Sequence, residues 1–324
     1  MVCNLFSRWI CGKRFNLKRR RPALPWRGNQ RSELLEDRTV PATITVTTFA
    51  DVVNPADGKI SLREAISQAN ATPAVDNIVL KAGIYSIEQI GADENGNATG
   101  DFDITRPVII TGAGDGKTII DGDDLDRVFD IEYDGEDTVT VSFVSLTIRN
   151  GLAGDGSGGG IRADVDDDGT VNVALLNASV RDNIATDVGG GIANFQGSVT
   201  LTNSFVSGNL SGSSGGGIFV DEGNVTLTTS VVSGNTAGTG GHERRRGSDA
   251  NGGGIAVIGG SVLLTGAPQG AATVKGASSV IDNVAADEGG GIWTTDEGTV
   301  TVEKLSSVRD NTARAYAPQV VAII

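Results

Sequence analysis

Two short motifs recur in step through the second half of this sequence, and they constrain its fold more than any other feature. Asn183, Asn209 and Asn235 lie 26 residues apart, and a glycine triplet follows Asn183 and Asn209 after six residues. Such self-similarity at a fixed period predicts stacked structural repeats. Gly-Gly-Gly-Ile begins at Gly158, Gly189, Gly215, Gly252 and Gly289, and Val/Ile-x-x-Asn ends at Asn150, Asn183, Asn209, Asn235, Asn283 and Asn311.

The segments between these motifs are typical of short β-strands. Residues 198–202 and 224–228 alternate apolar and polar side chains, and residues 76–150 contain similar runs without the paired motifs. A period near 26 residues accommodates about three strands of 4–5 residues with their turns. The sequence therefore predicts an all-β chain, a single-stranded right-handed parallel β-helix over residues 76–315, with about nine coils.

Each motif residue has a structural role in such a coil. Glycine takes positive φ without steric cost and lets neighbouring backbones approach closely. The isoleucine after the triplet can point inward and stack on its counterpart in the next coil. Asparagine tolerates the left-handed conformation and hydrogen-bonds neighbouring backbone, so the six asparagines are predicted to form a ladder at one corner. A row of binding side chains is the alternative interpretation.

The segment before the repeats predicts a cap, assigned to residues 43–75. Residues 43–50 alternate as a strand does, and residues 61–70 are predicted to form a helix. Ser61 and Glu64 have capping-box spacing. Leu62, Ala65, Ile66 and Ala69 would form one apolar face that covers the end of the stacked strands.

Residues 1–42 have the character of a leader. They hold ten Lys/Arg and three Asp/Glu, whereas the rest of the chain has a net charge of −21. The acidic body would repel nucleic acid. Both cysteines, Cys3 and Cys11, lie in the leader, so the body has no disulfide, and the chain has no run of about 18 apolar residues that would predict a transmembrane helix. We expect residues 1–42 to be disordered or absent from the mature protein.

Four parts of the sequence resemble known families. Leu35-Glu36-Asp37-Arg38 resembles a motif near the N-terminus of many planctomycete extracellular proteins. Residues 57–66 resemble the CSLREA domain of bacterial surface proteins, with Ile60 in place of the usual cysteine. The paired repeats resemble the GGA[ILV] and FxxN repeats of chlamydial polymorphic outer-membrane proteins, and residues 76–150 resemble the first coils of a pectin-lyase-like β-helix. These resemblances imply export and a cell-surface role.

The sequence predicts no catalytic, cofactor-binding or metal-binding residue. The runs Asp121-Gly122-Asp123-Asp124 and Asp166-Asp167-Asp168-Gly169 have turn composition, with Ca²⁺ binding or glycoside hydrolysis as the alternatives. The single histidine, His242, lies in a long insertion between Asn235 and the triplet at Gly252.

The leading functional hypothesis is a non-catalytic, secreted or cell-surface protein, located outside the cell or at the outer membrane. It would be adhesin-like or structural, with an unknown extracellular ligand or cell surface as partner. The alternative is a pectin-lyase-like polysaccharide lyase or hydrolase. Residues 316–324 are apolar and lack the glycine triplet. We therefore expect an uncapped tail there and end-to-end self-association.

Overall fold

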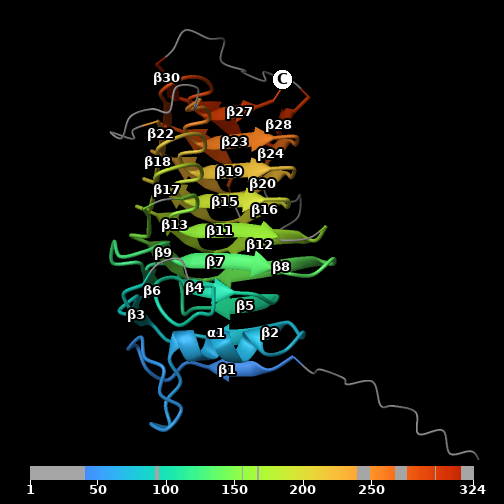
Figure 1. Cartoon of the computed structure of the whole chain (residues 1–324). Helices are drawn as coiled ribbons and strands as arrows, with labels where there is room; N and C mark the ends of the chain where they lie inside the picture. The colour runs from blue at the N-terminus through green and yellow to red at the C-terminus, as the bar shows by residue number, and fades with distance from the viewer. Residues whose placement is uncertain are drawn as a thin grey trace, which may run out of the picture. The chain divides into compact units, whose positions relative to one another are not determined.

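The structure is a computed structural model, and it describes residues 41–91, 95–154, 156–165, 168–238, 249–266, 276–295 and 297–314 (Figure 1). The predictions for the leader, for His242 and for the 316–324 tail concern residues outside these ranges. Residues 41 and 42 of the leader are the exception.

The described chain winds through four parallel β-sheets, here named A to D, and visits them in the order A, B, D, C in each complete coil. Sheet A contains β1 (Thr43–Thr45), β2 (Asp76–Val79), β5 (Val108–Thr111), β8 (Thr138–Val144), β12 (Thr170–Leu176), β16 (Val199–Thr202), β20 (Val225–Thr228), β24 (Val262–Thr265) and β28 (Val300–Val302). Sheet B contains β3 (Gly83–Ser86), β6 (Thr118–Asp121), β9 (Thr147–Arg149), β13 (Ser179–Arg181), β17 (Phe205–Ser207), β21 (Val231–Ser233), β25 (Ser279–Ile281) and β29 (Ser307–Arg309). Sheet C contains β4 (Phe102–Ile104), β7 (Phe129–Tyr133), β11 (Ile161–Val165), β15 (Ile192–Phe195), β19 (Ile218–Asp221), β23 (Ile255–Ile258) and β27 (Ile292–Thr294). Sheet D contains the two-residue strands β10 (Leu152–Ala153), β14 (Ile184–Ala185), β18 (Leu210–Ser211), β22 (Thr236–Ala237), β26 (Val284–Ala285) and β30 (Thr312–Ala313).

The predicted fold class is confirmed. Successive coils stack along one axis, every strand pair is parallel, and the fold is a right-handed parallel β-helix with one short helix near its N-terminal end (Figure 1). Two details differ from the prediction. A complete coil has four strands instead of three, because the corner between sheets B and C is long enough to pair as sheet D. Strand β1, which precedes the predicted β-helix, supplies the first strand of sheet A.

The glycine triplets make the corner between sheets D and C. The first glycine of each triplet has positive φ, 65° at Gly189 and 68° at Gly215. A Cβ at the second glycine would strike backbone of the next coil, at 2.4 Å from the Gly253 carbonyl oxygen in the case of Gly216. The isoleucines that follow pair in register and are at most 5% exposed, as predicted; they are Ile161, Ile192, Ile218, Ile255 and Ile292.

Helix α1 (Leu62–Asn70) lies beside the first coils and contacts β1, β2 and β4. The predicted capping box is present, since the Ser61 side chain accepts from the Glu64 N–H and the Glu64 side chain accepts from the Ser61 N–H. The predicted apolar face is buried; it consists of Leu62, Ala65, Ile66 and Ala69.

Arg63, on the same helix, is also fully buried, and the sequence pattern did not predict this burial. Its guanidinium makes a two-point ion pair with Asp51, at 2.7 and 2.9 Å, and donates to the carbonyls of Gly100 and Asp101. Its Cζ lies 4.7 Å from the centre of the Phe102 ring. Because all these partners compensate the buried charge, Arg63 fixes the helix to the first coils.

Candidate functional site

Five of the six predicted asparagines form a continuous ladder inside the corner between sheets B and D. The Oδ1 of each of the last four accepts hydrogen bonds from the backbone N–H and the Nδ2 of the asparagine one coil earlier, at 2.9–3.0 Å. The first four are at most 1% exposed, so their polar atoms are occupied within the protein. The five are Asn183, Asn209, Asn235, Asn283 and Asn311.

Asn150 lies outside the ladder. The backbone N–H of Gly151, one residue later, donates to Asn183 Oδ1 at 2.9 Å, whereas Asn150 Nδ2 bonds Asp121. Asn150 has φ of 51°, the left-handed conformation that Asp182 and Gly208 also adopt immediately before ladder asparagines. The residue with positive φ at this corner is therefore the one that precedes each ladder asparagine. The ladder asparagine itself does not have positive φ, and its side chain is buried in the interior.

In the first acidic run, residues 121–124 have the geometry of a turn. Asp121 is held by Arg149 at 2.7 Å, and Asp123 and Asp124 both have positive φ, of 52° and 55°, as turn residues do. Asp168 is exposed, while residues 166–167 and His242 lie outside the described residues.

A group of carboxylates that the sequence did not predict gathers on the outer face of sheet C. Asp103, Asp130 and Arg162 occupy one register row on β4, β7 and β11. Together with Asp101 and Arg127 they form what we call the acid–arginine cluster. The oxygens of its three carboxylates lie within 4.8 Å of one another, and each aspartate is under 8% exposed.

The two arginines tie three coils together within this cluster. Arg127 Nη1 lies 2.9 Å from Asp101 Oδ2 and 2.5 Å from Asp130 Oδ2. Arg162 Nη1 reaches Asp130 at 3.0 Å and Glu132 at 2.8 Å. Because Asp130 accepts from both arginines, the cluster is a network of charge-assisted hydrogen bonds, not a set of free carboxylates.

Burial raises the pKa of Asp101 to about 8, although Arg127 opposes the shift. Asp130, Asp126 and Asp103 add to the rise by repelling the charged form. Asp101 is therefore protonated near neutral pH, and one proton is held inside the cluster.

This proton makes stability depend on pH. Between pH about 4 and 8 the folded chain keeps the proton on Asp101, and the unfolded chain releases it, so this group's contribution falls as pH rises. We expect Asp101→Asn to remove that loss, so that wild type loses more unfolding free energy than the variant between pH 5 and pH 8.5 in urea titrations. Asp134→Asn is the control, because Arg106 lowers the pKa of exposed Asp134 and its titration lies below this window. Parallel curves for wild type and Asp101→Asn would refute the assignment.

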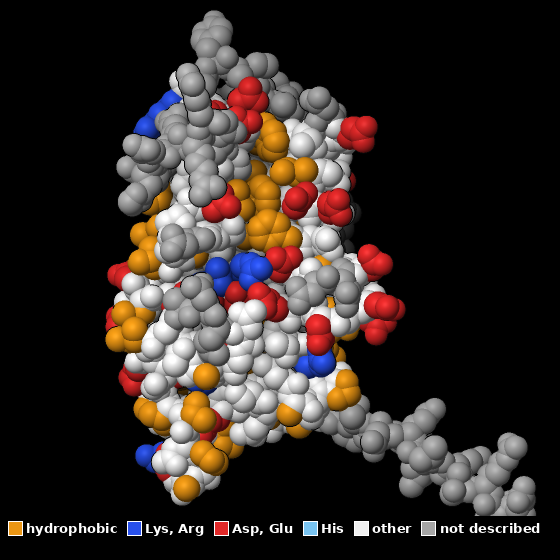
Figure 2. Space-filling model, in the orientation of Figure 1, with side chains coloured by type: hydrophobic (Ala, Val, Ile, Leu, Met, Phe, Trp, Pro, Cys, Tyr) orange, Lys and Arg blue, Asp and Glu red, His pale blue; other side chains and the backbone are white. Residues whose placement is uncertain are grey.

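An apolar strip continues the outer face of sheet C beyond the cluster. Ala193, Phe219, Ala256 and Trp293 follow Arg162 in the same register row, and Phe195 stands beside them with its ring centre 5.8 Å from that of Phe219. Phe195 and Trp293 are partly exposed. Figure 2 shows these hydrophobic side chains gathered next to the arginines on one face. The strip comprises Ala193, Phe195, Phe219, Ala256, Ile258 and Trp293.

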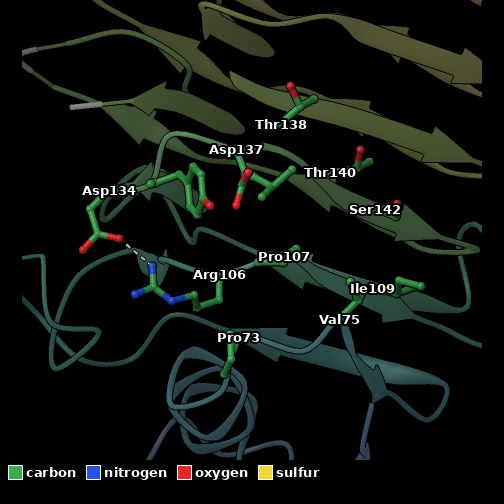
Figure 3. Close-up of a pocket in the computed structure, with 13 residues that line it drawn as sticks. Pro73, Val75, Arg106, Pro107, Ile109, Asp134, Asp137, Thr138, Thr140 and Ser142 are labelled. Carbon is green, nitrogen blue, oxygen red and sulfur yellow. Dashed lines mark hydrogen bonds and ion pairs between the residues drawn. The ribbon is translucent and has the colours of Figure 1, made fainter. Parts of the chain in front are cut away.

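A separate groove of about 900 Å³ lies on the outer side of sheet A, between β8 and β5 (Figure 3). Thr138, Thr140 and Ser142 of β8 line one wall, and Pro107 and Ile109 line the other. At its mouth Arg106 donates to Asp134, with Nη1 and Oδ1 2.5 Å apart. We call it the β5–β8 groove.

Comparison with known proteins gives distant structural likenesses and no sequence match. No protein-family model and no curated protein sequence matches this chain. Pectate lyase Pel9A is 16% identical over 87% of this chain and 82% of its own, with a TM-score of 0.29. The A-module of mannuronan C-5 epimerase AlgE4 from Azotobacter vinelandii is 14% identical over 83% of this chain and 100% of its own, with a TM-score of 0.22. Both are β-helix proteins, and at these TM-scores their activities are not transferred to this chain.

Within the described ranges, no helix has the length and apolar character that a membrane span requires.

Proposed function

We propose that this protein is an exported β-helix, secreted or held at the cell surface, that binds an extracellular glycan without transforming it. The observation that carries the proposal is the outer face of sheet C, where the apolar strip borders the acid–arginine cluster. Aromatic rings beside a few fixed polar groups are the usual composition of a small-molecule binding face. Rings such as Phe195 can stack on sugar rings, while Asp221, partly exposed next to Phe195 in the register of β15 and β19, can accept hydrogen bonds from hydroxyls.

Export rests on the leader and the junction. The Leu35-Glu36-Asp37-Arg38 motif and the CSLREA-like segment at residues 57–66 support a cell-surface or extracellular location. The described body, which lacks cysteine, needs no disulfide in that compartment, because the stacked core and the asparagine ladder already connect successive coils. N-terminal sequencing of protein secreted by the native host tests this part.

Phe195→Ala should weaken glycan binding. Removing a central aromatic anchor costs about 1.4 kcal/mol or more, which is about tenfold in affinity. The measurement is retention on a panel of immobilised neutral and acidic polysaccharides. Phe205→Ala is the matched control, because Phe205 is 46% exposed on the outer face of sheet B and should leave retention unchanged. Equal loss in both variants, or no retention of wild type on any polysaccharide, would contradict the proposal.

A polysaccharide lyase or hydrolase is the second candidate, and one observation favours it. Perturbed carboxyl groups gather at functional sites, and Asp101 has a pKa of about 8 among three carboxylates. A neutral carboxylic acid can act as a general acid. Against this, Arg127 and Arg162 already donate hydrogen bonds to the same oxygens that a substrate would need.

A further inference from the structure

Half of strand β8 has an open edge in the β5–β8 groove. All seven residues of β8 pair with β12 on one side, from Thr138 to Val144. On the other side the described residues of β5 pair only with Ser142–Val144. Thr138 and Val139 therefore lie beyond the start of β5, and Thr140 stands opposite a residue that is not part of that strand.

Three hydrogen bonds fix which backbone groups face the groove. Thr170 N–H donates to Asp137 O, and Ser145 N–H donates to Leu176 O, so the odd-numbered residues bond β12. Gly112 N–H donates to Val144 O, so the even-numbered residues face β5. By the alternation of a parallel ladder, Thr138 and Thr140 direct their N–H and C=O groups into the groove.

Proline explains why the neighbouring strand is short. Pro107 stands immediately before β5, in the register position opposite Thr140. It has no N–H to donate, and proline is found at the first residue or the edge of strands for that reason. In Figure 3 Pro107 and Pro73 lie across the groove from Thr138 and Thr140. The missing pairing is thus a consequence of the sequence at this position.

We propose that the β5–β8 groove receives an extended peptide strand of a partner protein, which adds to sheet A alongside residues 138–140. Strand addition to an open sheet edge takes its affinity from backbone hydrogen bonds and its specificity from alternate side chains. Three residues correspond to about 10 Å of strand. This site lies on a different sheet from the apolar strip, so the inference is independent of the proposed glycan binding.

Charge selects the kind of peptide. Among the lining residues, the exposed carboxylates of Asp134 and Asp137 stand against the single guanidinium of Arg106. Asp134 has its side chain 66% exposed. The partner strand should therefore carry lysine or arginine at its ends, with β-branched residues between them.

The test uses a fluorescent peptide, Lys-Thr-Val-Thr-Val-Thr-Lys, capped at both ends, and two versions that are N-methylated at alternate residues. A strand docks with one set of alternate N–H groups towards β8. We expect saturable binding by anisotropy, a loss of at least tenfold for one methylated version, and little change for the other. Equal affinities of the two versions, or no saturable binding of the parent peptide, would overturn the proposal.

Two protein variants locate the site. Thr140→Pro removes an N–H that faces the groove and leaves the bonds to β12 in place, so binding should fall at least tenfold in a folded protein. Asp137→Lys should weaken the Lys-ended peptide and strengthen a version with Glu at both ends. If Thr140→Pro does not fold, the deciding result is the affinity of Asp137→Lys for the Lys-ended and the Glu-ended peptides. Displacement of the peptide by oligosaccharides from the panel, with no effect of Asp137→Lys, would assign the groove to glycan and refute the peptide.

Discussion

Gly216→Ala is expected to destabilise the β-helix by about 4 kcal/mol or more, or to prevent folding. A Cβ at this position would lie 2.4 Å from the Gly253 carbonyl oxygen and 2.4 Å from the Thr236 carbonyl carbon. Both are backbone atoms of coils held by their own strand pairing, so they cannot move without separating the stack. Urea denaturation of the purified variant measures the loss.

Gly234→Ala is the matched control for this substitution. Gly234 has φ of 63°, and a Cβ there meets no atom within 4 Å. Alanine in that left-handed conformation should cost about 1–2 kcal/mol. If Gly216→Ala were no more destabilising than Gly234→Ala, close approach of coils would not be what the glycine triplets provide.

Asn209→Asp should destabilise by about 3–5 kcal/mol at neutral pH. The change replaces Nδ2, which donates to Val180 O and to Asn235 Oδ1, by an oxygen that repels both. The position is 1% exposed, so the new carboxyl either stays charged and is buried, or it takes up a proton at neutral pH. Both states cost unfolding free energy. Part of the loss should be recovered at low pH, where the carboxyl is neutral.

Asn203→Asp makes the same one-atom change at the surface. Asn203 Nδ2 donates to Asn177 Oδ1 in the preceding coil, but this pair is exposed, and aspartate tolerates the φ of 50°. The expected cost is under about 1 kcal/mol. Similar costs at both positions would show that burial of the ladder is not what makes it stabilising.

Much of the β-helix could be predicted because its sequence repeats. The glycine triplets, the inward isoleucines and five ladder asparagines each recur at the same point of a coil, so one structural explanation applies to all. Asn150 was included because it ends a similar run, but the coil there is one residue out of phase and Gly151 takes the ladder position. The two-residue strands of sheet D were too short to leave a pattern of their own.

The acid–arginine cluster could not be predicted, because its residues do not recur at a fixed spacing. Asp103, Asp130 and Arg162 lie 27 and 32 residues apart in coils of unequal length, before the paired motifs become regular. Their alignment depends on the register of β4, β7 and β11, which sequence spacing does not determine. Arg63 is similar, since its partner Asp51 and its carbonyl acceptors come from loops on either side of the helix.

The proposal that this protein binds glycan without transforming it is tested most directly by following bound polysaccharide over time. Wild type and Asp101→Asn are incubated with each retained polysaccharide, and new reducing ends and unsaturated ends are measured alongside retention. We expect retention of both proteins and no increase in chain ends. Time-dependent release of shortened or unsaturated chains by wild type, lost in Asp101→Asn, would contradict the account and establish an enzyme that uses the acid–arginine cluster.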